Sequence, residues 1–260
     1  MMQSLKTVNG LRIFFEEMGD MAFFAGRFFR ELFSSPFEHK ELLRQCYIVG
    51  VKSLSLVAVT GFILGLVFTL QSRPTLMKFG AQSWMPSMII LSIVREIGPV
   101  VIALICAGKI GSGIGAELGS MRVTEQIDAM EVSGTNPFKY LVVTRILAAT
   151  LMLPILVIFG DAVAIVGSAL VENLKGEVSY QLYFIQIFEA LKFSDLIPAT
   201  VKTFFFGFAI GLVGCYKGYN CKNGTVGVGE ASNAAVIYAS MLLFVLDFVA
   251  VFITDIFYGV

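Results

Sequence analysis

Five long apolar stretches, separated by short polar ones, dominate the chain. They cover residues 54–70, 86–107, 146–171, 197–216 and 235–256. Each is close to the roughly 20 residues that an α-helix needs to cross about 30 Å of hydrocarbon. The pattern therefore predicts an all-α integral membrane protein with five transmembrane helices, in which residues 1–260 form a single domain.

The stretch before the first span has a different pattern. Within residues 8–36, apolar side chains recur on one helical face and charged side chains on the other. The apolar set is Leu11, Phe14, Phe15, Met18, Met21, Ala25, Phe28, Phe29 and Leu32, and the charged set is Glu16, Asp20, Arg27 and Glu31. Such a helix suits the membrane surface, so we expect an interfacial amphipathic helix here. It lacks the features of a cleaved signal peptide.

Composition and charge narrow the class of protein. Hydrophobic residues make up 57% of the chain and charged residues 15%, and the mean hydropathy is +0.81. The formal net charge is zero, which argues against a nucleic-acid partner. One His and four Cys without a CxxC pair give no spacing for a metal site, and we expect free thiols and no catalytic residues.

The loops differ in their content of Lys and Arg, which sets the expected orientation. Residues 1–53, 108–145 and 217–234 contain seven, four and two, whereas 71–85 and 172–196 contain two each. Because cytoplasmic loops carry the excess of basic residues, we expect a cytoplasmic N-terminus and a periplasmic C-terminus.

Four charged residues lie inside the apolar stretches: Arg95, Glu96, Lys202 and Asp247. Counted from the outer ends of their spans, Glu96 and Asp247 lie about 15 and 14 Å deep, and Lys202 about 9 Å deep on a long stem. Their charges sum to zero, which predicts a shared polar network. Pro99 cannot donate to the carbonyl of Arg95 and leaves that oxygen free. The network could brace the helices or contact a substrate.

The longest polar connection, residues 112–135, contains a run that predicts a short helix from Thr124 onward. Glu125, Asp128 and Glu131 recur at steps of three, and Gly134 with the following Asn-Pro pair stops the run. A solvated acidic face is one interpretation. The other is a surface by which a transporter responds to a cytoplasmic ATPase.

The sequence "AELGSMRVTEQIDAMEVSGTNP", together with "REIGPV" and "LDF", resembles the MlaE (YrbE) family of bacterial ABC-transporter permeases. The similarity covers nearly the whole chain. The resemblance implies a multi-pass permease subunit of the inner membrane that moves phospholipid between the inner and outer membranes. It also implies a homodimer that binds a cytoplasmic ABC ATPase dimer and a periplasmic ring of MCE-domain proteins, with or without a small accessory subunit.

By the same resemblance, residues 112–135 are expected to be the coupling-helix segment. Its expected polar contacts with the ATPase are Glu117, Arg122, Glu125, Gln126, Asp128 and Glu131. The chain contains no phosphate-binding loop of its own, because Ala103 and Ile110 replace required residues around Gly108-Lys109. We therefore expect ATP and Mg²⁺ to be bound by the partner ATPase, with no cofactor in this chain.

Two further features concern the substrate path and helix packing. The apolar residues Leu70, Leu76, Met77 and Phe79, near the outer ends of the first two spans, are expected to form a wall for lipid tails, with interfacial anchoring as the alternative for Trp84.

Glycines spaced by four at Gly61/Gly65, Gly111/Gly115/Gly119 and Gly207/Gly211 predict close helix contacts, mostly within the chain.

Two other classes of protein could use buried acidic residues. A secondary transporter or channel would use Glu96 and Asp247 as ion sites, but such proteins often contain an internal repeat that the five unequal spans do not show. An intramembrane aspartyl protease would need Asp161 and Asp247 in paired motifs, which are absent.

Overall fold

The structure is a computed structural model that describes residues 2–35, 38–175, 179–222 and 224–258, with side chains described from residue 16 onward except those of Gln82 and Tyr258. Every regular element in those ranges is a helix. Five continuous helical segments are long and apolar enough to cross a membrane: His39–Lys78, Met85–Val123, Phe138–Leu174, Phe193–Tyr219 and Gly224–Phe257. The all-helical fold with five spans is thus confirmed.

Several of these segments are divided by short changes of helical winding. The first contains α2 (His39–Gly50), η1 (Val51–Ser53) and α3 (Leu54–Lys78). After η2 (Gln82–Trp84), the second contains α4 (Met85–Ser92), η3 (Ile93–Ile97), α5 (Gly98–Cys106), η4 (Ala107–Gly111) and α6 (Ser112–Val123). The rest are α7 (Gln126–Val132), η5 (Phe138–Val143), α8 (Thr144–Leu174), α9 (Tyr180–Ala190), α10 (Phe193–Tyr219) and α11 (Gly224–Tyr258).

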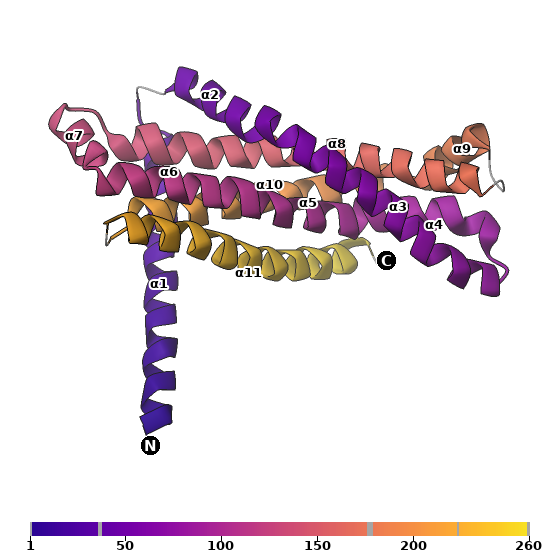
Figure 1. The fold of residues 1–260 in the computed structure, drawn as a ribbon, viewed down its shortest axis with the longest axis horizontal. Helices are drawn as coiled ribbons and strands as arrows, with labels where there is room; N and C mark the ends of the chain where they lie inside the picture. Colours follow the sequence, from indigo (N-terminus) through magenta and orange to yellow (C-terminus); the bar gives the residue numbers. More distant parts are fainter. Residues whose placement is uncertain (1, 36–37, 176–178, 223, 259–260) are drawn as a thin grey trace.

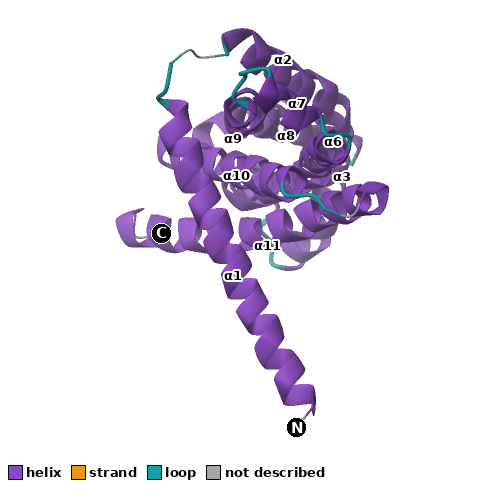
Figure 2. Cartoon of the chain, turned by 90° about the vertical axis from the view of Figure 1, so that its left-hand side faces the viewer, coloured by secondary structure: helices purple, strands orange, loops and turns teal. Residues whose placement is uncertain are grey.

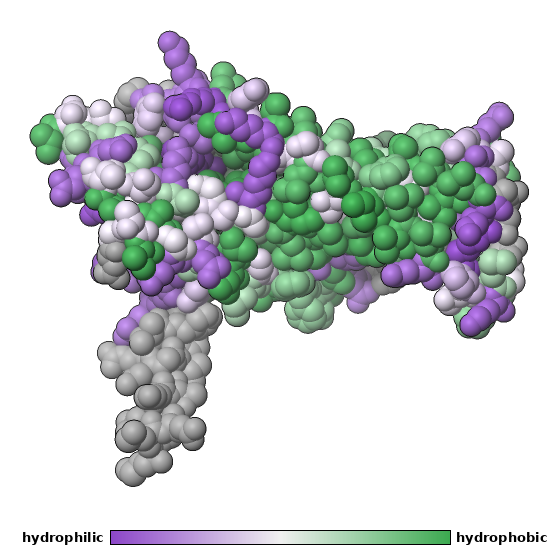
Figure 3. All heavy atoms as spheres, in the orientation of Figure 1, coloured by the Kyte–Doolittle hydropathy of each residue, from purple (hydrophilic) through white to green (hydrophobic). Residues whose placement is uncertain are grey.

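The long helices run side by side and give the bundle two polar ends. Figure 1 shows α7 at one end and α9 at the other, which we call the α7 end and the α9 end. Figure 3 shows a broad apolar band between them, with polar residues gathered at both ends. The helices extend beyond the apolar stretches of the sequence because hydropathy marks only the part that lies in hydrocarbon.

Glycines bring the backbones of four helices into contact. Gly61 and Gly65 of α3 lie against the backbone of Gly160 and Ala164 in α8. On α10, a Cβ at Gly207 would lie 2.5 Å from the carbonyl oxygen of Ala149, and one at Gly218 would lie 2.8 Å from that of Gly115. The predicted glycine contacts within the chain are confirmed. They join α3 to α8, α8 to α10, and α10 to α6.

Helix α1 (Met2–Leu32) crosses the bundle near its α7 end and extends away from it (Figures 1 and 2). Met21 and Phe28, from the predicted apolar face, are buried, whereas Phe29 is half exposed. The Phe24 ring packs edge-on against Phe138 at 4.9 Å. Glu17 accepts hydrogen bonds from Lys217 of α10 and, at 2.7 Å, from the Tyr238 hydroxyl of α11. Helix α1 thus runs across the long helices rather than alongside them.

Helix α9 lies in residues 172–196, where the hydropathy pattern predicts only a connection. Tyr183 of α9 is buried and shares a 2.5 Å hydrogen bond with Ser168 of α8. The Thr69 hydroxyl of α3 donates to Ser168 at 2.7 Å. These contacts hold α9 against α8 and α3 at the α9 end of the bundle.

Candidate functional site

Lys202 of α10 joins two carboxylates from other helices inside the apolar band. Its Nζ lies 2.7 Å from Oε2 of Glu96 in η3 and 3.0 Å from Oδ1 of Asp247 in α11. The Lys202 side chain is 6% exposed. A cation at this depth needs such partners, because an unpaired charge in hydrocarbon costs several kilocalories per mole. The structure therefore brings three of the four predicted charges together.

Arg95 has a different partner, which the hydropathy pattern does not reveal. Its Nη2 and Nε lie 2.6 and 3.1 Å from Oδ1 of Asp195, in the first turn of α10. Oδ2 of Asp195 accepts the backbone N–H of Lys192 and caps the helix. Asp195 lies outside the predicted span 197–216 because α10 begins earlier, at Phe193. The sequence signal that could have revealed Asp195 is the capping pattern, in which an acidic residue follows the N-cap of a helix by three positions.

The local helix geometry explains why two neighbouring residues have different partners. Consecutive side chains on a helix point in different directions, whereas Asp195 and Lys202 are seven residues apart and share one face of α10 at a rise of about 10.5 Å. Arg95 and Glu96 lie in the π-helical turn η3, which is followed by Pro99 at the start of α5. Single π-helical turns occur often at functional sites.

These charges line a pocket of about 560 Å³ between the second span, α10 and α11. Its charged lining residues are Arg95, Glu96, Lys192, Asp195, Lys202 and Asp255. One wall is apolar and comes from α11, where the rings of Phe248 and Phe252 stack with centroids 6.5 Å apart. The pocket is thus amphipathic, with charges on one side and aromatic and aliphatic groups on the other.

The four residues expected to form an apolar lipid wall lie away from this pocket. Leu70, Met77 and Phe79 are exposed at the end of the α3 segment, and Leu76 packs against the buried cluster around Met85. None of them is among the residues that line the pocket in the described part of the chain. Their predicted role stays a prediction, and the apolar side of the pocket itself contains Phe248 and Phe252.

The predicted coupling segment, residues 112–135, divides into two parts at the α7 end. Its first half is α6, a continuation of the second span, and its second half is the short helix α7. Glu125 makes the turn between them with φ of 57°, and Ile127 anchors α7 in the core. The exposed side chains of this turn and helix include Glu125, Gln126, Asp128 and Glu131. Arg122 pairs with Asp128 at 2.6 Å.

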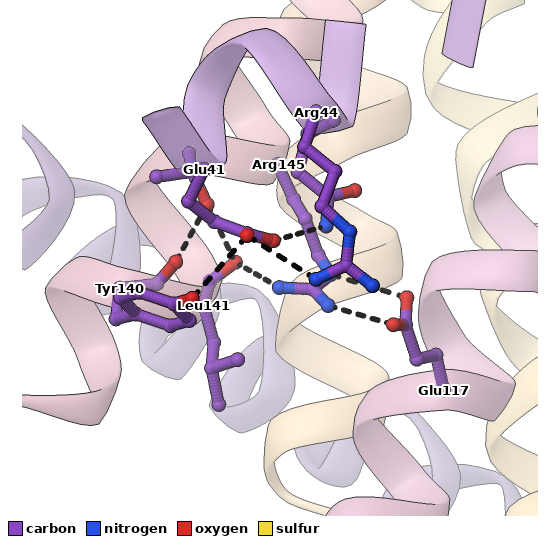
Figure 4. A network of polar contacts seen from close by, with 8 residues as sticks. Glu41, Arg44, Glu117, Tyr140, Leu141 and Arg145 are labelled. Carbon is purple, nitrogen blue, oxygen red and sulfur yellow. Dashed lines mark hydrogen bonds and ion pairs between the residues drawn. The ribbon is translucent and has the colours of Figure 1, made fainter. Parts of the chain in front are cut away.

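Glu117 differs from the other expected ATPase contacts. It lies on α6, and its Oε1 accepts from Nη2 of buried Arg145 at 2.9 Å (Figure 4). Arg145 also donates to the carbonyl oxygen of Leu141 at 3.0 Å. Next to this pair, buried Glu41 accepts from Gln45 at 2.7 Å. Glu117 therefore has a structural partner within the chain and joins α6 to α8.

The described residues contain no cluster of three His, Cys, Asp or Glu that could hold a metal ion. All four cysteines are free. Asp161 is buried in α8, and its carboxylate packs against Gly98 of α5. Asp247 instead contacts Lys202 of α10.

Comparison with known proteins places the chain among transport proteins. Residues 42–253 match the family model described as Permease MlaE. A probable ABC transporter permease protein of Rickettsia felis is 36% identical over 95% of this chain and 94% of its own length. A probable ABC transporter permease protein of Synechocystis is 30% identical over 92% of this chain and 91% of its own length.

A third relative has a more specific name. The intermembrane phospholipid transport system permease protein MlaE of Haemophilus influenzae is 32% identical over 80% of both chains. With five helices able to span a bilayer, this protein is a multi-pass membrane protein, of the inner membrane in bacteria. The chain belongs to the MlaE family of ABC-transporter permeases.

Proposed function

We propose that this permease moves phospholipid, or a similar lipid, between the inner and outer membranes, and that a separate ATPase subunit drives it. The amphipathic pocket between α10 and α11 is the observation that supports this most. A phospholipid has a charged head and apolar tails, and the pocket offers both kinds of surface within the membrane-spanning part of the chain. The Haemophilus influenzae relative carries the name of such a transport system.

The two polar ends of the bundle support a proposed orientation in the membrane and a proposed set of partner proteins. The α7 end contains most of the basic loop residues, so we place it and the N-terminus in the cytoplasm and the α9 end in the periplasm. Helix α1 then lies in the cytoplasmic membrane surface. A second copy of the chain, a cytoplasmic ATPase dimer that binds ATP and Mg²⁺, and a periplasmic MCE ring complete the proposed assembly, with or without an accessory subunit.

The same contacts weigh against the alternative of a secondary transporter or channel. An ion site at Glu96 and Asp247 would need their oxygens to be available for the ion. Both carboxylates instead share the ammonium group of Lys202, at 2.7 and 3.0 Å. The positive charge that an ion would supply is already present on the chain.

Reconstitution tests the proposal directly. The purified chain alone should hydrolyse no ATP, because it has no phosphate-binding loop. Purified with its ATPase and placed in vesicles, it should transfer phospholipid only when ATP and Mg²⁺ are present. Sustained hydrolysis by the chain alone, or lipid transfer that does not depend on ATP, would contradict the proposal.

Charge reversal at Glu125 and Asp128 tests the coupling segment. Both residues are exposed at the turn and on α7, so replacing them together by Lys should leave the fold intact, with at most about 1 kcal/mol lost from the Arg122–Asp128 pair. ATPase binding should weaken by about tenfold, because interfacial charges set the register of association. Copurification and ATP turnover measure the effect.

The matched control reverses charge at the opposite end of the bundle. Glu189 is exposed on α9, and its replacement by Lys should not change ATPase binding. Equal copurification of the ATPase with the α7 variant and the α9 variant would remove this segment from the interface.

A further inference from the structure

Arg95 and Glu96 use only part of their hydrogen-bonding capacity within the chain. Arg95 donates from Nε and Nη2 to Asp195, and a guanidinium has five N–H donors. Glu96 gives Oε2 to Lys202, and a carboxylate has about four acceptor sites. The two side chains are 37% and 44% exposed, respectively, and both line the pocket. A donor and an acceptor of opposite charge therefore both line this pocket, with hydrogen-bonding capacity left for a ligand.

The outer rim of the same pocket repeats this pair of charges. Lys192 and Asp255 line the pocket and are exposed. Neither is in an ion pair with another described residue. Lys192 precedes α10 and Asp255 lies near the end of α11, so they come from the two helices that bound the pocket.

The charge balance of the lining limits which head groups fit. The lining holds three cations and three carboxylates, and Arg95 is paired with Asp195. Lys202 is shared between Glu96 and Asp247, which is not itself a lining residue, so this group has one excess negative charge. The rim adds one cation and one carboxylate. A net anionic head group would find partners in Lys192 and Arg95 but would leave Asp255 and Glu96 unpaired beside it, whereas a head group with both charges finds a partner for each.

On this basis, and resting on the proposed function, we propose that the pocket selects phospholipids with a zwitterionic head group. The phosphate would lie against Lys192 and the free donors of Arg95. The ammonium group would lie against Asp255 and the free oxygen of Glu96. The stacked rings of Phe248 and Phe252 then form the surface for the beginning of the tails.

Two rim variants test this selection in the complete assembly with its ATPase. Vesicles contain equal amounts of phosphatidylethanolamine and phosphatidylglycerol, and the transfer of each is measured together with the ratio of the two lipids that copurify with the protein. Wild type should favour phosphatidylethanolamine in both measurements. Asp255→Asn should lower that preference about two- to fivefold, the effect of one exposed charge contact.

Lys192→Met should act differently, because both lipids carry the phosphate. Transfer of both should fall by about two- to fivefold, with the preference little changed. Glu189→Gln and Lys175→Met are the matched controls, since they remove the same charges from exposed positions that do not line the pocket. Both controls should behave as wild type.

The two measurements separate this inference from the proposed function. ATP-dependent transfer with equal use of both lipids, or with phosphatidylglycerol favoured, would overturn head-group selection and leave the proposed function intact. A copurified-lipid ratio that follows the rim variants, without any ATP-dependent transfer, would support selection by the pocket and refute the proposed function. An Asp255→Asn variant with the wild-type lipid ratio would overturn the inference.

Discussion

Lys202→Met is expected to abolish lipid transfer and to destabilise the protein. The substitution leaves the carboxylates of Glu96 and Asp247 facing each other without the cation that lies 2.7 and 3.0 Å from them. Removing one partner of a buried charge group costs about 3 to 5 kcal/mol. We expect the lower end of that range, because the Glu96 side chain is 44% exposed. Thermal unfolding in detergent measures the loss, and reconstituted transfer measures function.

A neutral version of the network separates bracing from substrate contact. Combining Lys202→Met with Glu96→Gln and Asp247→Asn removes all three charges, and replacing a whole buried ion group is often close to neutral for stability. Restored stability with transfer still absent would place the charges on the lipid path. Restored stability with normal transfer would show that they serve only to brace the helices. Lys78→Met, at an exposed position, is the control for loss of one positive charge.

Gly207→Ala is expected to have the second large effect, through packing alone. The new Cβ would lie 2.5 Å from the carbonyl oxygen of Ala149 and 2.8 Å from the Cα of Thr150. Backbone atoms cannot rotate away as a side chain can, so α10 and α8 must separate along their length. Overpacking of this kind costs about 1 to 3 kcal/mol, and we expect the upper end of that range. The measurement is again the unfolding temperature in detergent.

A second glycine gives the matched control. Gly113 lies on α6, and a Cβ added there would meet no atom of another helix within 4 Å. Alanine favours a helix over glycine by about 0.5 to 1 kcal/mol, so Gly113→Ala should leave stability unchanged or raise it slightly. Equal unfolding temperatures for the two variants would show that the contact between α8 and α10 tolerates a methyl group.

The sequence predicts those features of the fold that follow from the cost of placing each residue in the hydrocarbon of the membrane. The number of spans follows from length and hydropathy. The meeting of Lys202 with Glu96 and Asp247 follows from depth and charge, because three isolated charges in apolar helices need one another. The glycine contacts follow from spacing, since a four-residue repeat lies on one helical face.

Other features depend on where helices begin and on which faces meet. The role of Asp195 is not predicted because α10 starts before its apolar stretch, and hydropathy does not mark the polar first turn of a helix. Helix α9 escapes it because its place in the structure comes from the buried hydroxyl of Tyr183. The sequence does not show that Glu117 pairs with Arg145, because this contact depends on how α6 packs against α8.

The glycine contacts also distinguish the centre of the bundle from its periphery. Helices α3, α8, α10 and α6 touch through their backbones, and buried side chains such as Leu118, Ile146 and Ile210 fill the space beside those contacts, so these helices form the packed centre of the bundle. Helix α11 meets that centre closely at its start, where a Cβ on Gly115 would lie 3.3 Å from Ala235 and Ser232 donates to Ser112 at 3.1 Å. Packing continues along the helix to Ala239 and Leu243, which are buried. Beyond Leu243, most large apolar side chains of α11 are exposed, and the ion pair between Lys202 and Asp247 holds that part of the helix to α10.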